Sequence, residues 1–144
     1  MTAQELAEAC AAALFAADTA SQSLGVRIGG VGPGRATATM TVTAGMLNGH
    51  AIGHGGYVFL LADTAFAFAC NTYDRVTVAA GADVSFLEPA RAGDELTATA
   101  VERSRRGRSG LYDVTVHRAD GTVLAEFRGR SRSSGTPILG PSGH

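Results

Sequence analysis

The sequence predicts a single α+β domain in which one apolar helix lies against a curved antiparallel sheet. The segment 57–73 is apolar on nearly every face, so a helix there must be surrounded by protein on most sides. Four strand-like runs come after it, at 76–86, 95–104, 111–118 and 122–131. The connections between the later runs are short, which favours antiparallel neighbours.

The first part of the chain predicts a helix and a β-hairpin. Thr2 and Glu5 form the Thr-x-x-Glu pattern of a capping box, and the alanine-rich stretch that they open ends near Asp18. The glycines of segment 29–34 predict a turn, and the alternating run 35–43 after it predicts a half-buried strand. A loop over residues 46–56 then leads into the core helix.

Length and composition predict one globular domain, residues 1–133, with a flexible tail over 134–144 that has no periodic pattern. Hydrophobic residues make up 45% of the chain and charged residues 17%, which suits a protein with a real core. The formal net charge of −1 gives no broad positive field, so neither DNA nor RNA is expected as a partner.

The sequence also predicts a cytoplasmic location without membrane attachment. Glu5 and Glu8 stand where a secretory signal would carry basic residues. The apolar segment 57–70 is interrupted by Asp63 and is too short to cross a bilayer. Cys10 and Cys70 are too few and too far apart for a disulfide framework, so both are expected as buried thiols.

Asp63 is the residue that most needs an explanation. An ionised carboxylate between Leu61 and Phe66 is costly unless it is paired, hydrogen-bonded or wet. One interpretation is a solvent-facing helix position, or a carboxylate satisfied by Thr64. The other is a general base or a nucleophile.

The segment His54-Gly55-Gly56 stands where the core helix begins. The free backbone N–H groups of a helix start, together with its dipole, suit a carbonyl that gains negative charge, although a flexible turn is the simpler alternative. Asp63 lies roughly 12 Å further along the same helix, so one subunit cannot apply both groups to one carbonyl. We therefore expect a two-fold dimer in which Gly55 of one chain faces Asp63 of its partner.

Several other site chemistries fit the sequence poorly. His50 and His54 have a spacing that could suit zinc, but they lie in a loop with no obvious third ligand. No Gly-x-Ser-x-Gly motif occurs, and the glycine run 29–34 leads into a strand rather than a helix. No metal or redox cofactor is therefore expected.

A cluster of arginines lies at the turn between two predicted strands, at Arg103, Arg105, Arg106 and Arg108. Guanidinium groups in such a turn could bind phosphates. A solvated hairpin tip is an equally good interpretation of the residues alone.

The segments 46–50, 54–56 and 61–71 resemble the hot-dog thioesterases of bacterial phenylacetate degradation. The resemblance continues through 86–89, 92–94, 110–114 and 127–129, so it covers most of the chain after the first helix. It implies a hot-dog fold and hydrolysis of an aryl-CoA thioester, phenylacetyl- or hydroxyphenylacetyl-CoA, to the carboxylic acid and free coenzyme A. It also implies that dimers pair again into tetramers.

The same resemblance implies roles for individual residues. Asp63 activates water or attacks the thioester, Gly55 N–H and the Asn48 amide hold the thioester oxygen, and His54 holds the loop and Asn48 in place. It places coenzyme A, as part of the substrate, along the turn of Arg105, Arg106, Gly107, Arg108 and Ser109. Further substrate contacts are expected from Gly56, Tyr57, Thr64 and Phe86.

Three points remain open at this level. Some relatives carry a serine on the strand after the core helix, whereas segment 78–82 here reads Val-Ala-Ala-Gly-Ala, which leaves Thr64 or no hydroxyl to assist Asp63. Tyr57 could stack on an aromatic acyl group or simply pack in the core. The same fold could also bind acyl-CoA without turnover, or act as a dehydratase with His50 or His54 as its base.

Overall fold

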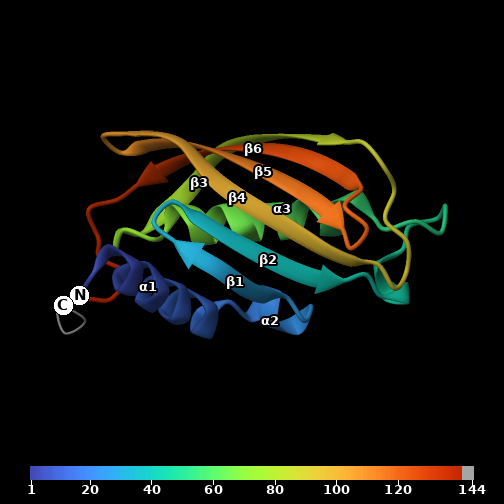
Figure 1. Ribbon diagram of the computed structural model, residues 1–144, viewed down its shortest axis with the longest axis horizontal. Coiled ribbons are helices and arrows are strands. Elements are labelled where there is room, and N and C mark those ends of the chain that lie inside the picture. The colour runs from blue at the N-terminus through green and yellow to red at the C-terminus, as the bar shows by residue number, and fades with distance from the viewer. Residues whose placement is uncertain (141–144) are drawn as a thin grey trace.

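A computed structural model describes residues 1–140. Its elements, in chain order, are α1 (Ala3–Ala17), α2 (Thr19–Ser23), β1 (Arg27–Gly32), β2 (Arg35–Thr41), η1 (Ala44–Met46), α3 (Gly55–Cys70), β3 (Thr77–Phe86), β4 (Glu95–Arg106), β5 (Ser109–Arg118) and β6 (Val123–Ser133). The strands form one six-stranded sheet in the order β1-β2-β4-β5-β6-β3, and every neighbouring pair is antiparallel. Figure 1 shows the sheet curving around α3, with α1 beside β1. The predicted α+β architecture is confirmed.

The helix α3 is held against the sheet by aromatic packing. The ring of Phe66 lies 5.6 Å from that of Tyr112 on β5 and 5.7 Å from that of Phe127 on β6. Gly129 permits this approach, because a Cβ atom there would lie 2.8 Å from the Phe66 ring. A larger residue at 129 would therefore push the helix off the sheet.

One side of α3 is not covered by its own sheet. Gly56, Phe59, Asp63 and Ala67 are spaced three to four residues apart and remain partly or fully exposed, whereas Leu61, Phe66 and most of the other α3 side chains are buried. Asp63 therefore lies on the uncovered side of an otherwise buried helix. Within residues 1–140, no helix combines the length and apolar character needed to cross a bilayer.

The start of the chain agrees with the prediction at α1 and departs from it afterwards. Thr2 and Glu5 each accept the other's backbone N–H at 3.0 Å, so both halves of the capping box are present. Asp18 does not simply end the helical region. Its carboxylate accepts the Ser21 N–H at 3.0 Å and caps α2, which the sequence pattern did not reveal.

The predicted turn over residues 29–34 is wrong in extent. Gly29 pairs with Thr37 and Gly32 with Arg35, so most of the glycine run belongs to β1. The turn itself is confined to residues 33 and 34, where Gly34 adopts a φ of +72°. Glycine permits a turn at each of these positions, but the pairing with β2 needs a turn only at the last.

The segment after β6, which the sequence predicts as part of a flexible tail, makes backbone hydrogen bonds over residues 134–140. Ser134 N–H donates to the Val76 carbonyl at 2.8 Å, and Val76 N–H donates to the Thr136 carbonyl at 2.8 Å. The Asp74 carboxylate accepts the N–H of Ile138 at 3.0 Å. These partners are distant in sequence, so periodicity could not show them. Residues 141–144 lie outside the described residues, and the domain boundary at 133 stays a prediction.

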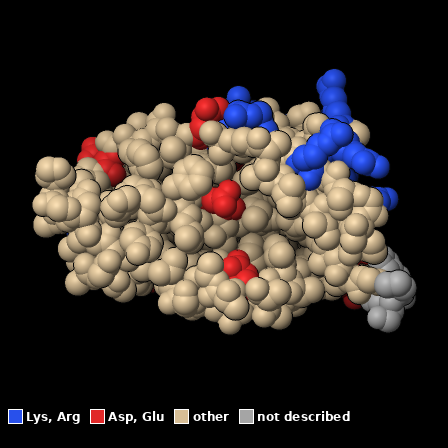
Figure 2. Space-filling model, turned by 180° about the vertical axis from the view of Figure 1, so that it is seen from behind, with Lys and Arg blue, Asp and Glu red and all other residues tan. Residues whose placement is uncertain are grey.

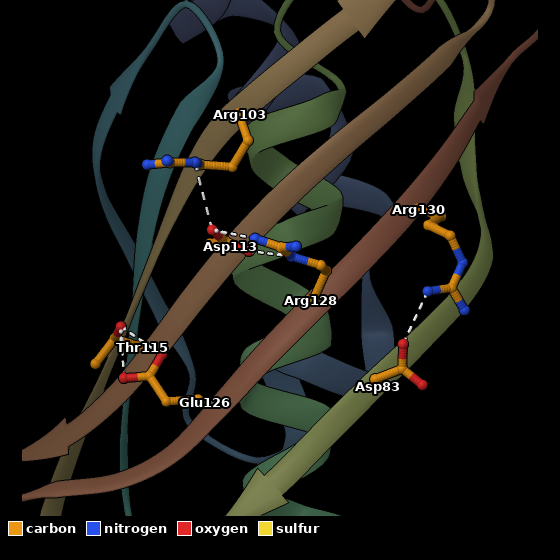
Figure 3. Close-up of polar contacts among 7 residues, drawn as sticks. All are labelled: Asp83, Arg103, Asp113, Thr115, Glu126, Arg128 and Arg130. Atoms are coloured by element: carbon orange, nitrogen blue, oxygen red, sulfur yellow. Dashed lines mark hydrogen bonds and ion pairs between the residues drawn. The ribbon is translucent and has the colours of Figure 1, made fainter.

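The outer face of the sheet, away from α3, carries paired charges (Figure 3). Arg128 donates two hydrogen bonds to Asp113, at 2.7 and 3.0 Å, and Arg130 pairs with Asp83 at 2.9 Å. The hydrogen bonds from Arg128 hold the pKa of Asp113 below its ordinary value of 3.8. A hollow of about 650 Å³ lies here, but its charged groups largely satisfy one another and the pairs are solvent-exposed. This face is not the candidate site.

Both cysteines are buried free thiols, as predicted. Burial is the main cause that raises the pKa of Cys70 to about 12. Cys70 therefore stays protonated near neutral pH and is a poor nucleophile.

Candidate active site

A cavity of about 400 Å³ lies at the start of α3 and is lined by Asn48, Gly55 and Phe86, among others. Gly55 is the first residue of the helix, and its N–H has no acceptor among residues 1–140. The Asn48 side-chain oxygen accepts the N–H of His50 at 2.9 Å, which leaves its amide nitrogen without a partner in the same part of the chain. Two hydrogen-bond donors therefore line one cavity, as an oxyanion site requires.

His54 caps α3 from the preceding loop. Its Nδ1 accepts the Gly56 N–H at 2.9 Å, so a neutral ring carries its proton on Nε2. Its backbone N–H donates to the Met46 carbonyl at 2.8 Å, and its ring meets the Tyr57 ring edge-on at 6.4 Å. These contacts tie the loop to the helix start. The expected positioning role of His54 is compatible with them and stays a prediction.

The two aromatic residues expected near the substrate have different surroundings. Tyr57 is half-buried against His54 and is absent from the lining of the cavities at either end of α3. Phe86 is 54% exposed and lies over the helix start, where a Cβ atom on Gly55 would be 3.2 Å from its ring. The geometry therefore favours Phe86 over Tyr57 as a contact for a bound group.

A second cavity, of about 520 Å³, lies further along α3 on its uncovered side. Asp63 lines this cavity, and most of the other lining residues are apolar. They are Ala13, Leu14 and Ala17 of α1, Phe66, Ala67 and Cys70 of α3, Asn71 just after α3, residues 76–79, and Ile138. Burial raises the pKa of Asp63 above its ordinary value of 3.8. No hydrogen bond or ion pair to the side chain is present among residues 1–140. An unpartnered carboxylate of raised pKa is a stronger base than an exposed one.

Thr64 does not lie in this cavity. Its hydroxyl donates to the Leu60 carbonyl at 2.8 Å and is 3.5 Å from the Ser21 hydroxyl, on the side of the helix that faces α2. Of the two alternatives left open by the sequence, Thr64 or no hydroxyl, the geometry of this chain does not favour Thr64, and the hydroxyl that lines the cavity is that of Thr77, at the start of β3. Thr77 donates to the Arg75 carbonyl at 2.8 Å and contacts Ser133 at 2.9 Å. Nothing local in the sequence distinguishes Thr77 from other strand residues.

A third cavity, of about 290 Å³, is basic and shares Cys70 and Thr77 with the Asp63 cavity. Arg75, Arg105 and Arg108 line it. The Arg105 guanidinium stacks 3.5 Å from the centre of the Tyr73 ring and lies 3.7 Å from Glu102. Figure 2 shows basic side chains gathered at the end of the molecule that holds the β4–β5 turn. A basic cavity thus adjoins the cavity of the candidate base.

The basic cavity differs from the predicted arginine cluster in its members. Gly107 lines it, but Arg106 and Ser109 do not, and Ser109 instead lies 3.4 Å from Arg132. Arg103 pairs with Asp113 at 3.4 Å on the outer face. Arg75 was missed, because it comes from the loop before β3 and only the fold brings it to the β4–β5 turn.

The Gly55 cavity and the Asp63 cavity have no lining residue in common. The separation follows the helix spacing that the sequence predicts. Each cavity therefore carries half of the expected chemistry. Among residues 1–140, no group of three or more His, Cys, Asp or Glu side chains could hold a metal ion, and the expectation of no cofactor stays a prediction.

A long helix wrapped by an antiparallel sheet, with this division of donors and carboxylate along it, is the architecture of a hot-dog thioesterase. The chain belongs to the Thioesterase superfamily, whose sequence model matches residues 50–125. Its resemblance to the hot-dog thioesterases of phenylacetate degradation is confirmed, and the chain is an acyl-CoA thioesterase of this family.

Individual relatives support this assignment along most of the chain. The acyl-coenzyme A thioesterase PaaI of Escherichia coli K12 is 45% identical over 128 residues, which cover 89% of this chain and 91% of that protein. The structure of E. coli PaaI, from the phenylacetic acid degradation operon, superposes with a TM-score of 0.93 at 42% identity, covering 94% and 99% of the two chains. The TT0310 protein of Thermus thermophilus superposes with a TM-score of 0.77 at 35% identity, covering 80% and 97%.

Proposed function

We propose that this thioesterase hydrolyses aryl-CoA thioesters, phenylacetyl- or hydroxyphenylacetyl-CoA, and that Asp63 is its catalytic carboxylate. The observation that carries the proposal is the half-buried Asp63, with a raised pKa, in an apolar cavity that adjoins a basic one. An apolar acyl group and an anionic coenzyme A moiety need these two environments side by side. The location of the E. coli relative in a phenylacetic acid degradation operon supports an aryl acyl group, and the Phe66 ring in the cavity wall offers it a partner.

In the proposed reaction, Asp63 removes a proton from water as the water oxygen attacks the thioester carbon, or attacks that carbon itself. The carbonyl oxygen gains negative charge, and Gly55 N–H and the Asn48 amide of the partner subunit stabilise it. The C–S bond then breaks, and the leaving thiolate takes up a proton to give free coenzyme A. In the water route, Asp63 returns the proton that it removed; in the direct route, water hydrolyses the anhydride formed between Asp63 and the acyl group, which releases the acid. Arg75, Arg105 and Arg108 hold the phosphates of the coenzyme.

The partner subunit enters the proposal because the donors and the base of one chain lie in separate cavities. Two further features support a covering copy. The uncovered side of α3 exposes Gly56 and part of Asp63. The edge strand β3 carries Val78 at 60% exposure, and Val76 in the loop just before it is 39% exposed. We propose a two-fold dimer, which pairs again into a tetramer, in the cytoplasm. Light scattering tests the assembly, and a fully active monomer would contradict it.

The activity is tested by following thiol release from phenylacetyl-CoA and from a straight-chain acyl-CoA. Asp63→Asn keeps the side-chain volume and removes the basic carboxylate, so kcat is expected to fall at least about a hundredfold. Asp83→Asn, on the outer face of the sheet, is the matched control and should retain activity. If wild-type protein binds acyl-CoA without releasing thiol, the chain is an acyl-CoA binding protein instead.

A further inference from the structure

The segment that follows β6 forms part of the wall of the Asp63 cavity. Ile138 lines this cavity together with Leu14 of α1 and Val78 of β3. The chain reaches it five residues after the end of the last strand at Ser133. The segment contributes a bulky apolar side chain to a cavity whose other walls come from the folded core.

Asp74 holds this segment in place. One oxygen of its carboxylate accepts the backbone N–H of Ile138 at 3.0 Å and that of Leu139 at 2.8 Å. Asp74 is 7% exposed and adopts a φ of +58°, a conformation that aspartate tolerates better than most residues. Two charge-assisted bonds to one buried oxygen fix consecutive backbone units, and so fix the position of the Ile138 side chain.

The remaining walls of the cavity are less free to change. Phe66 is packed between Tyr112 and Phe127, Leu14 packs against the hydrophobic core, and Val78 belongs to the ladder of β3 with β6. Ile138 belongs to no helix or strand. Its side chain can therefore vary in size with less disturbance of the core than any of these three.

We propose that Ile138 sets the size of the acyl group that the Asp63 cavity accepts, and that Asp74 is the positioning residue for it. The inference rests on the proposed function in one respect, that an acyl group occupies this cavity. Replacing Ile138 by alanine removes three carbons from the wall and makes room for a longer chain. Each methylene that becomes buried strengthens binding about fourfold.

The test measures dissociation constants by calorimetry for thioether analogues of acyl-CoA, which cannot be hydrolysed, with phenylethyl, hexyl and decyl groups. For Ile138→Ala, the preference for decyl over hexyl should rise at least about tenfold relative to wild type. Leu139→Ala is the matched control, because Leu139 is held by the same carboxylate but is absent from the lining of the cavity. An unchanged preference in Ile138→Ala would overturn the proposal.

Two substitutions separate the role of Asp74 from a general loss of folding. Asp74→Gly tolerates the backbone conformation but removes the acceptor, so its size preference should shift in the direction of Ile138→Ala. Its amide protons at 138 and 139 should also exchange faster with solvent. Asp74→Asn keeps an oxygen acceptor and should restore the wild-type preference to within about twofold. If Asp74→Gly binds the analogues as wild type does, the positioning role is wrong.

The Ile138→Ala variant keeps Asp74 intact, so it tests the cavity wall even if Asp74→Gly does not fold. The thioether analogues also separate the inference from the proposed function. A wild-type protein that releases no thiol would contradict the function, while the analogue affinities would still confirm or overturn the role of Ile138.

Discussion

The two cavities along α3 differ in the groups that they offer to the proposed reaction. At its start, a loop-bound cavity presents donors from Gly55 and Asn48. Further along, an apolar cavity presents the carboxylate of Asp63 next to the arginines. If Asp63 lay beside the donors of its own chain, it would accept their hydrogen bonds, which would lower its pKa and weaken it as a base. In the proposed dimer, the carboxylate and the donors come from different chains, and the thioester oxygen rather than Asp63 accepts the hydrogen bonds of the donors.

The Gly55 N–H can be removed by a single substitution. Gly55 is the first residue of α3, a position where proline is favoured, and His54 before it has φ −61° and ψ 131°, which suit a residue that precedes proline. Gly55→Pro therefore removes the N–H while leaving the helix intact. The expected loss in kcat is about 10²–10³-fold, the cost of one oxyanion donor.

Gly55→Ala is the control for this change, because it keeps the N–H and adds the same Cβ atom 3.2 Å from the Phe86 ring. Its loss of kcat should be less than about tenfold, since the exposed Phe86 can move aside. Equal losses in the two variants, with unchanged circular dichroism, would show that crowding and not the N–H is responsible.

The basic cavity beside Asp63 can be tested separately for phosphate binding. Arg105→Gln removes a guanidinium that is held over Tyr73, and should raise KM for acyl-CoA about tenfold with little change in kcat. The same variant should leave KM unchanged for the acyl-pantetheine thioester, which lacks the nucleotide phosphates. Arg103→Gln on the outer face is the matched control. A rise in KM for both substrates would place Arg105 outside phosphate binding.

The smallest expected effect is on the stability of the folded protein, to which the Asp63 carboxylate contributes. Burial raises the pKa of Asp63 in the folded state above 3.8, so the folded protein holds this proton more tightly than the unfolded chain does. The contribution to stability is therefore full below pH 3.8 and is lost as the pH rises through the folded-state pKa. Asp63→Asn avoids this loss.

Differential scanning calorimetry measures the effect. At pH 7, Asp63→Asn should melt on the order of 2 °C above wild type, and the difference should shrink as the pH approaches 3.8. A variant that melts below wild type at pH 7 would indicate that the ionised carboxylate has a stabilising partner.

The features that the sequence predicts correctly are those that a local pattern of residues determines. The capping box of Thr2 and Glu5 and the spacing of Gly55 and Asp63 along one helix are local, and the structure has both. Arg75 could not be found, because its approach to Arg105 depends on how the loop before β3 meets the β4–β5 turn.

Side-chain direction and long-range contacts account for the other differences between the sequence-based predictions and the structure. Thr64 is next to Asp63 in sequence, but successive helix residues point about 100° apart, so its hydroxyl faces Ser21. The segment after β6 has a composition typical of flexible chain, yet buried Asp74 supplies its backbone partners. In both cases the missing information is a contact between residues that no local pattern connects.

Subunit complementation tests the shared site most directly. Asp63→Asn and Gly55→Pro are each expected to be nearly inactive, and the two variants are co-expressed in equal amounts so that they assort at random. If Asp63 of one subunit works with Gly55 of its partner, one of the four combinations is intact, and the mixture should recover about a quarter of wild-type thiol release whether the dimers remain free or pair into tetramers. Activity no higher than that of the separate variants would contradict a site built from two chains.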